Sequence, residues 1–320
     1  MSLEAIKKKA AKIDKIIGVQ TASDIVVDWI ENELKVQDNP MVTGFSKFDE
    51  DLRNNLRGKL GIFAGYGGSK KSLFALNLSC HNAFKQSGKA VYSTMEMSAT
   101  NLLDRMIDFQ FGYQQNERAV DYFRNKLDHS NKELIQKTLQ SSLSEYYGDR
   151  LLISQQARMK PDDYRRLLDA TIEKHGEINT LIVDGLSMMG GDGSEVEVYS
   201  ENSAALKEIA NEYNIFVGLI AHLSKGLDVD TRDVRTHIRG SQKITDNCDF
   251  LMMFSLIQQL EDEGLEVRKD LGFIRLYNKR QTGNIIDSIY KFDEGRLLLE
   301  ESNLDPRNFP EQQENKKGKW

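Results

Sequence analysis

Residues 60–72 read LGIFAGYGGSKKS, an apolar strand that runs into a glycine-rich turn. A helical pattern follows over residues 72–86. Glycines let backbone N–H groups converge on an anion, and the N-terminus of the following helix adds a partial positive charge. This order of strand, glycine-rich loop and helix predicts a phosphate-binding loop in an α/β protein.

Two side chains of the loop carry its expected chemistry. Lys71 is placed to reach the β and γ phosphates of a nucleoside triphosphate, and the Ser72 hydroxyl is placed to ligate magnesium. The common pattern is G-x-x-x-x-G-K-[ST], and Lys70 stands where its second glycine is expected. This departure leaves open an altered loop or a loss of hydrolytic competence, and the alternative to a phosphate site is an ordinary Gly/Ser turn with two solvated lysines. The residues expected to bind ATP in the loop are Gly65, Gly67, Gly68, Ser69, Lys70, Lys71 and Ser72.

Two predicted strands lead to acidic residues. The apolar segment TLIVD ends at Asp184, and VYSTME ends at Glu96. Because the carboxyl ends of parallel strands face the ligand crevice, we expect Asp184 to complete a magnesium site with Ser72. Glu96 is the candidate general base for the attacking water. The structural alternatives are that Asp184 caps the next turn and that Glu96 favours the N-terminus of a helix capped by Ser98.

Strands and helices alternate along most of the chain. The predicted strands cover residues 60–64, 90–94, 151–154, 180–184, 216–221, 250–254, 271–277 and 285–292. The predicted helices cover residues 72–86, 99–111, 161–175 and 200–213, with charged helical segments between 115 and 147. This alternation predicts a mainly parallel central sheet covered on both faces. The predicted parts are a short helical N-terminal appendage over 1–40 with helices at 2–17 and 23–34, an α/β domain over 41–302, and a polar tail over 303–320.

Composition restricts the class of protein. The chain has 320 residues, 39% of them hydrophobic and 29% charged, with a formal net charge of −6. It has no apolar stretch of about 18 residues, so we expect no membrane span or membrane partner, and its Lys-rich start does not resemble a signal peptide. Cys80 and Cys248 lack metal-like spacing, so we expect reduced core thiols and a reducing, cytoplasmic compartment of a bacterial or phage-infected cell. Any contact with nucleic acid needs a locally positive surface.

Several segments match, in order, a known set of motifs. They are Thr43-Gly44-Phe45 with Asp49, residues 65–72, residues 93–98 (STMEMS), residues 181–184 (LIVD), residues 219–223 (LIAHL), residues 238–241 (IRGS), Asp246 and Asp249, and residues 278–283 (NKRQTG). Together they resemble the hexameric replicative DNA helicases of the DnaB and Twinkle type, including the helicase half of phage primase-helicases. The resemblance covers about residues 41–300 and implies a RecA-like P-loop ATPase core.

The resemblance adds catalytic roles to those of Lys71 and Glu96. His222 matches a polar residue that senses the γ-phosphate, and a neutral imidazole can hydrogen-bond a phosphate. Arg280 matches an arginine finger that is donated to the nucleotide of the neighbouring subunit. Lys279 is a weaker match to an ATP-binding lysine, because the family's lysine falls on Asn278 here. The alternatives are a histidine satisfied at a strand end and a charged residue of a hairpin turn.

By the same resemblance, DNA-facing loops cover residues 225–243 and 190–200. The residues expected to bind DNA are Lys225, Arg232, Arg235, Arg239 and Lys243. This local positive charge would be repeated around a ring channel, which multiplies its field. The segment 190–198 is glycine-rich and acidic, so its backbone amides would make the contact. The alternative for both segments is an ordinary solvated loop.

The sequence thus predicts a ring-shaped, ATP-driven helicase that translocates on single-stranded DNA in replication, 5′–3′ by resemblance. The expected cofactors are ATP and Mg²⁺, and the partners that the resemblance implies are further copies of the chain in a hexameric ring and a primase or other replication protein. The apolar face of residues 25–34 would dock on the next subunit or pack on its own domain. Two other functions stay open: a RecA-like ATPase of recombination or signalling, and a degenerate nucleotide-binding loading factor.

Overall fold

The computed structural model describes residues 22–85, 88–148, 150–223, 238, 241–261 and 264–309. The chain divides into two compact units, one ending at Pro40 and the other beginning at Met41. In the first unit, α2 (Ala22–Asp38) includes the predicted second helix, and the helix predicted over residues 2–17 lies outside the described residues. Among the described side chains of α2, the exposed apolar ones are Ile25, Val26, Trp29, Ile30 and Leu34.

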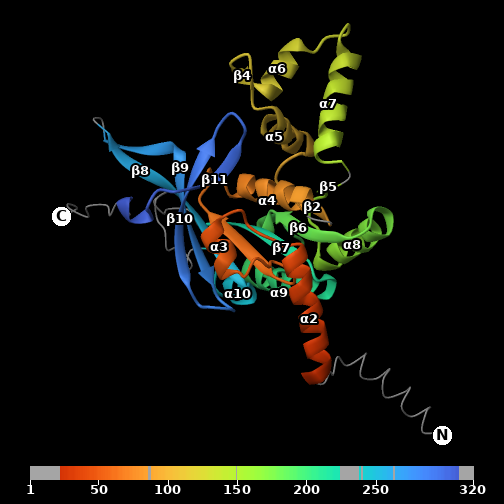
Figure 1. Cartoon of the computed structure of the whole chain (residues 1–320), viewed down its shortest axis with the longest axis vertical. Coiled ribbons are helices and arrows are strands. Elements are labelled where there is room, and N and C mark those ends of the chain that lie inside the picture. The colour runs from red at the N-terminus through yellow and green to blue at the C-terminus, as the bar shows by residue number, and fades with distance from the viewer. Residues whose placement is uncertain are drawn as a thin grey trace. The chain divides into compact units, whose positions relative to one another are not determined.

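The second unit is built on a sheet that has nine strands within the described residues, in the order β11-β10-β9-β8-β1-β7-β6-β2-β5 (Figure 1). The strands are β1 (Leu60–Gly65), β2 (Lys89–Thr94), β5 (Leu151–Gln155), β6 (Ile178–Asp184), β7 (Phe216–His222), β8 (Phe250–Glu261), β9 (Gly264–Asn278), β10 (Ile285–Asp293) and β11 (Leu298–Ser302). The six adjacent strands β8, β1, β7, β6, β2 and β5 run parallel to one another. Beyond β8, the strands β9, β10 and β11 extend the sheet, each antiparallel to its neighbour. The predicted mainly parallel α/β sheet is confirmed.

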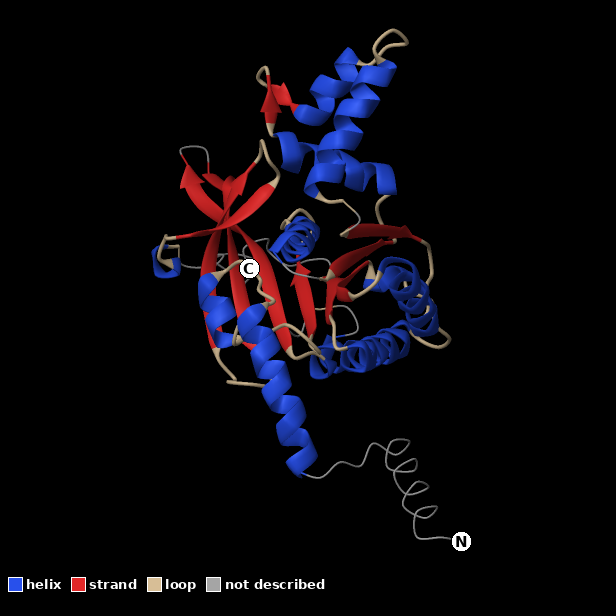
Figure 2. Cartoon of the chain, turned by 45° about the vertical axis from the view of Figure 1, so that its right-hand side comes forward, coloured by secondary structure: helices blue, strands red, loops and turns tan. Residues whose placement is uncertain are grey.

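Helices cover both faces of this sheet (Figure 2). The helices of this unit are α3 (Ser46–Asp51), α4 (Lys71–Lys85), α5 (Ala99–Phe111), α6 (Ala119–Lys126), α7 (Lys132–Tyr146), α8 (Pro161–His175), α9 (Glu195–Tyr213) and α10 (Ser241–Asn247). Of these, α6 and α7 pack with α5 in a separate cluster and do not cover the sheet. The core on the α4 face includes Phe63 and Phe74, and the core on the α9 face includes Ile62 and Leu206. Phe63 and Ile62 lie in different cores because successive residues of a strand point to opposite faces of the sheet.

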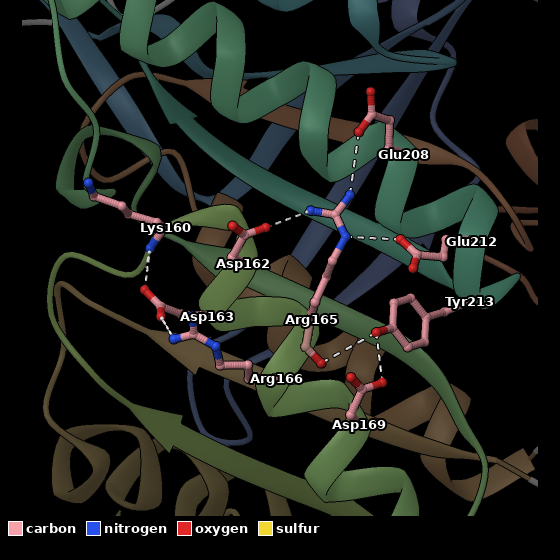
Figure 3. A network of polar contacts seen from close by, with 9 residues as sticks. All are labelled: Lys160, Asp162, Asp163, Arg165, Arg166, Asp169, Glu208, Glu212 and Tyr213. Atoms are coloured by element: carbon pink, nitrogen blue, oxygen red, sulfur yellow. Dashed lines mark hydrogen bonds and ion pairs between the residues drawn. The ribbon is translucent and has the colours of Figure 1, made fainter.

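The polar network in Figure 3 fixes α8 against α9. The Nε of Arg165 on α8 donates to Glu212 at 3.0 Å, and its Nη2 lies 3.4 Å from Glu208, both on α9. At the end of α9, the Tyr213 hydroxyl donates to Asp169 of α8 at 2.8 Å. These contacts hold together the two helices that cover the face opposite α4.

Several elements differ from the sequence-based expectations. The strands predicted over 250–254 and 271–277 are the inner parts of the long β8–β9 hairpin, whose polar outer part hid its strand pattern. The predicted loop over 190–200 ends early, because Ser194 and Glu197 form a capping box that starts α9 at Glu195. Elements missed entirely are α3, α10, β11, the short strands β3 (Tyr113–Gln114) and β4 (Glu117–Arg118), and the 3₁₀ turns Leu186–Met188 and Pro306–Asn308.

Two further expectations concern single residues and helix length. Cys80 and Cys248 are buried and free of disulfides, as predicted. Among the helices of the described ranges, none combines the length and apolar character that crossing a membrane requires. The part of the predicted tail that follows residue 309 lies outside the described residues.

Candidate nucleotide-binding site

The glycine-rich loop connects β1 to α4 at the carboxyl edge of the parallel strands. A Cβ added to Gly65 would lie 2.5 Å from the Phe254 carbonyl oxygen and 2.5 Å from Ser69 Oγ, so only glycine fits there. The Ser69 hydroxyl and the Lys71 ammonium both donate to the Tyr66 carbonyl, at 2.8 and 3.0 Å. The loop therefore curls around the Lys71 ammonium, next to the N-terminus of α4.

Lys71 and Lys70 lie in different surroundings. Lys71 is only 4% exposed, and its burial lowers the pKa of its ammonium while the charges of Glu96 and Asp184 oppose the shift. Lys70 has a φ of +67°, the left-handed conformation that glycine adopts without strain. Its ammonium lies 4.1 Å from the ring centroid of Phe292 on β10, a cation–π distance. The unusual lysine is therefore accommodated with a glycine-like backbone and an aromatic contact for its charge.

Ser72 and Asp184 lie together although they are far apart in the sequence. The Ser72 Oγ is 3.4 Å from Asp184 Oδ1, and Asp184 Oδ2 accepts a hydrogen bond of 2.7 Å from the Tyr92 hydroxyl. Burial raises the pKa of Asp184 above its ordinary value, and the hydrogen bond from Tyr92 opposes this shift. The strand order brings β6 close to β1, so the strand-end acid reaches the start of α4 as predicted.

The oxygen donors of this pair fit magnesium. Mg²⁺ prefers hard oxygen ligands and is bound through few protein groups, together with phosphate oxygens and water. Within the described ranges, no group of three or more His, Cys, Asp or Glu side chains is arranged to hold a metal ion by itself. A hydroxyl and a single carboxylate beside a phosphate loop therefore suit a cation that arrives with a nucleotide.

Glu96 and His222 form a pair that the sequence did not reveal. The Glu96 Oε1 lies 2.8 Å from His222 Nε2, at the ends of two strands separated by β6. Thr94 fixes the turn that contains Glu96, because its hydroxyl donates to the Met97 carbonyl at 2.8 Å and accepts from the Met97 amide at 3.1 Å. The hydrogen bond from His222 lowers the pKa of Glu96, the nearby Lys71 adds to this effect, and burial opposes it. Glu96 is therefore ionised at neutral pH.

A cavity of about 470 Å³ lies over the loop and is lined by Lys71, Ser72, Glu96 and His222, while Asp184 is fully buried behind Ser72. Its lining outside the loop includes Glu96, Met97, Arg105, Arg118, His222, Phe292 and Leu297. Arg105 on α5 and Arg118 on β4 were missed in the sequence, where nothing linked them to the loop. Arg118 is held by the fully buried Asp108, which accepts its Nε at 3.0 Å. A larger cavity of about 770 Å³, beside Lys47 and Arg307, has no glycine-rich loop in its lining.

Lys279 and Arg280 lie at the edge where the parallel strands begin, whereas the loop lies at the edge where they end. Phe250 of β8 pairs with Gly61 of β1 and with Asn278 of β9, so the turn after Asn278 lies at the amino end of β1. The loop begins four residues further along β1, about 13 Å away at about 3.3 Å per residue. The cavity lining includes neither residue. The structure therefore does not bring the predicted finger to the phosphate loop of its own chain.

The turn that carries Arg280 is fixed by Asp51 at the end of α3. Asp51 accepts hydrogen bonds from Asn278 Nδ2 at 2.6 Å, Thr282 Oγ1 at 3.0 Å and Asn284 Nδ2 at 2.6 Å. The Arg280 side chain is 48% exposed. This turn thus presents a half-exposed arginine side chain at the surface.

Lys279, next to Arg280, is held by contacts to its own chain. Its ammonium donates to the Thr245 carbonyl and lies 3.3 Å from Asp246 Oδ1. Both partners belong to α10, so this lysine fixes the turn to the helix at the end of the predicted DNA loop 225–243.

The predicted DNA-binding residues fall almost entirely outside the described residues. These are Lys225, Arg232, Arg235 and Arg239. Lys243 lies in α10, but its side chain is not among those described. At the segment's edge, Leu223 and Ile238 form an isolated antiparallel bridge. The DNA-binding assignments stay a prediction.

Known proteins of similar sequence agree with the nucleotide-binding geometry of this site. The family model "DnaB-like helicase C terminal domain" matches residues 40–291. A probable replicative DNA helicase of Trieres chinensis is 25% identical over 279 residues, which cover 82% of this chain and 58% of that protein. The replicative DNA helicase DnaB of Geobacillus stearothermophilus is 24% identical over 277 residues, covering 80% of this chain and 58% of that protein. The chain thus spans less than two thirds of the length of these relatives.

Solved structures show the same fold. The ATPase domain of G40P superposes with a TM-score of 0.69 at 16% identity, covering 90% of this chain and 100% of that one. A DnaB-like replicative helicase, described with its interactions with primase, gives a TM-score of 0.67 at 16% identity, covering 92% of this chain and 72% of that one. The predicted RecA-like P-loop fold is confirmed. Because the family model matches most of the sequence, the chain belongs to the family of DnaB-like helicase C-terminal domains.

Proposed function

We propose that the chain is the motor of a ring-shaped DNA helicase that hydrolyses ATP and translocates 5′–3′ on single-stranded DNA during replication. One observation carries the proposal. The phosphate loop, Ser72 and the Glu96–His222 pair line one cavity, the buried Asp184 lies 3.4 Å from Ser72 Oγ, and Arg280 is presented at the opposite edge, where the parallel strands begin. A complete site then requires two copies of the chain, as a ring of identical subunits provides.

Each group of the site has a separate role in this proposal. Lys71 and the loop amides bind the phosphates, and Arg105 and Arg118 add positive charge to the same cavity. Ser72 and Asp184 would hold Mg²⁺, which neutralises charge on the phosphate oxygens when bound. Glu96 orients the attacking water and accepts its proton.

His222 links this chemistry to the DNA loop. It donates to Glu96 and ends β7, directly before the segment that carries most of the predicted DNA-binding residues. A change in the Glu96–His222 hydrogen bond would shift the start of that segment. Binding of single-stranded DNA and hydrolysis of ATP would then be coupled through one side chain.

The rest of the chain has an assembly role in this proposal. The exposed apolar face of α2 would dock on the next subunit, and a primase or other replication protein is the expected partner of the ring. The segment 1–40 would then be a docking linker, 41–302 the motor and 303–320 a polar tail.

The direct test combines turnover and assembly. We expect ATP hydrolysis to rise when single-stranded DNA is added, native mass spectrometry with ATP and Mg²⁺ to give a closed ring of six copies, and a forked duplex to be unwound with 5′–3′ polarity. Nucleotide binding without turnover would favour the loading-factor alternative. Turnover that ignores DNA would favour a RecA-like ATPase of another pathway.

We expect His222→Ala to shift the acidic limb of the turnover–pH profile to higher pH. Glu96 must be ionised to accept a proton, and His222 lowers its pKa, so loss of the imidazole raises that pKa. The measurement is turnover against pH at saturating ATP and Mg²⁺. His175→Ala, at the end of α8, is the matched control. An unmoved limb in His222→Ala would mean that Glu96 is not the group that titrates in turnover.

We expect Lys70→Gly to keep turnover close to that of the wild type. The change relieves a left-handed lysine, worth about 1 kcal/mol, and loses a cation–π contact of about 0.5–1 kcal/mol, so the two effects nearly cancel in stability. Phosphate release and thermal unfolding measure both. Phe292→Leu is the companion variant, because it removes the ring and keeps Lys70. A drop in turnover of about tenfold or more would show that the Lys70 ammonium leaves the ring to bind phosphate.

A further inference from the structure

Tyr92 places a hydroxyl group beside Asp184 in the interior of the domain. The side chain is fully buried on β2, and its hydroxyl lies 2.7 Å from Asp184 Oδ2 and 3.3 Å from the Ser72 carbonyl oxygen. A phenol has a single proton to donate, and a carboxylate oxygen at the shorter distance is the stronger acceptor. Tyr92 therefore donates to Asp184.

The strand register explains how the two side chains meet. Tyr92 pairs with Ile182 of the adjacent β6, and Asp184 lies two residues further along the same strand. Residues two apart on a strand share a face, so Asp184 and Ile182 both point to the α4 side of the sheet. Tyr92 reaches along that side to the first turn of α4, where Ser72 lies.

We propose that Tyr92 is a positioning residue for the magnesium ion of the nucleotide. It holds Oδ2 of Asp184, which leaves Oδ1 directed at the Ser72 hydroxyl 3.4 Å away. The inference rests on the proposed function, in which Ser72 and Asp184 hold that ion.

The physical basis is the torsion of the carboxylate. The terminal torsion of an aspartate is broad, so an aspartate without a partner on one oxygen samples several orientations. A hydrogen bond to a charged carboxylate in a buried site is strong and selects one of them. Partners that orient metal ligands in this way typically contribute about 10- to 100-fold to metal affinity.

Tyr164 provides a matched control. It is also fully buried, and its hydroxyl lies 3.4 Å from Ser93 Oγ on β2, next to Tyr92 in the sequence. It belongs to the core on the other face of the sheet, together with α8 and α9. Removing either hydroxyl costs a buried polar group, but only Tyr92 contacts Asp184.

The test is a titration with Mn²⁺, a paramagnetic substitute for Mg²⁺, on the full chain with a non-hydrolysable ATP analogue. Bound Mn²⁺ is followed by electron paramagnetic resonance in the wild type, Tyr92→Phe, Tyr164→Phe and Asp184→Asn. We expect Tyr92→Phe to raise the half-saturating Mn²⁺ concentration about 10-fold, and Tyr164→Phe to leave it unchanged. The Mg²⁺ concentration needed for turnover should rise by the same factor in Tyr92→Phe, while affinity for the metal-free analogue stays the same.

Three results separate the possibilities. If Asp184→Asn binds Mn²⁺ like the wild type, the proposed metal site is wrong. If Asp184→Asn weakens Mn²⁺ binding and Tyr92→Phe does not, the metal site stands and the role of Tyr92 is wrong. Equal losses in Tyr92→Phe and Tyr164→Phe would assign the effect to packing around β2 and overturn the proposal as well.

Discussion

Lys71→Ala is expected to reduce ATP turnover by about 100- to 1000-fold or more. The Lys71 ammonium is almost fully enclosed by the loop, where a charge acts on phosphate oxygens with little screening by water. Loss of one such group from a shielded site typically removes several kcal/mol of transition-state stabilisation. Steady-state phosphate release at saturating ATP and Mg²⁺ measures the effect.

Two variants control for damage to the loop. Lys70→Gly removes the adjacent lysine and keeps a backbone conformation that glycine tolerates, so its turnover should stay high. Lys71→Met keeps most of the side-chain volume without the charge and should be as inactive as Lys71→Ala. Turnover in Lys71→Ala that equals that of Lys70→Gly would end the assignment of this loop as the phosphate site.

The parts of the candidate site whose placement could be predicted are those that a short stretch of sequence determines. The glycine-rich loop needs only the strand before it and the helix after it, and the apolar segment before Asp184 specifies a buried strand by itself. Because parallel strands end at the same edge, Ser72 and Asp184 were expected to meet without any knowledge of strand order.

The parts that were missed depend on contacts across the sheet or on short elements. The Glu96–His222 pair requires the order β7-β6-β2, which no local pattern contains. Arg118 reaches the cavity from a hairpin of two-residue strands, whose turn residues Gln115 and Asn116 both have positive φ. Strands that short carry no readable alternation of apolar and polar residues.

Lys70 shows a different limit. Its presence in place of glycine suggested an altered loop, because the identity of a residue does not reveal its φ. The structure gives it a glycine-like φ of +67° and a partner for its charge in Phe292, which lies far away in the sequence. The loop therefore keeps the backbone geometry that glycine would give, and the effect of Lys70 on hydrolysis is what the Lys70→Gly experiment measures.

Arg280→Ala is expected to leave ATP binding intact and to reduce hydrolysis by about 10³- to 10⁵-fold, the contribution of an arginine finger in other phosphoryl-transfer enzymes. In its own chain, Arg280 lies at the amino end of β1, away from the phosphate loop. Its loss should therefore not disturb the site of the subunit that carries it. Binding of a fluorescent ATP analogue and phosphate release measure the two effects separately. Arg268→Ala, on β9 ahead of that turn and paired with Asp270, is the control.

Loosening the turn that carries Arg280, without removing Arg280 itself, tests the same role with a smaller expected effect. Asp51→Ala removes the acceptor shared by Asn278, Thr282 and Asn284 but leaves the Arg280 side chain in place. A loosened turn should lower hydrolysis less than Arg280→Ala does, again with ATP binding unchanged. Equal activity of Asp51→Ala and the wild type would mean that the turn does not need this support.

Mixing two inactive variants decides whether the finger acts between subunits. Arg280→Ala subunits keep an intact phosphate loop, and Lys71→Ala subunits keep an intact Arg280. In mixed rings some interfaces combine the intact loop of one subunit with the intact finger of its neighbour, so hydrolysis should partly return. The exchange of subunits must be verified, for example by native mass spectrometry of isotope-labelled copies. If exchanged rings remain inactive, or if a proven monomer hydrolyses ATP at the full rate, the site is complete within one chain, and the ring motor proposed here is wrong.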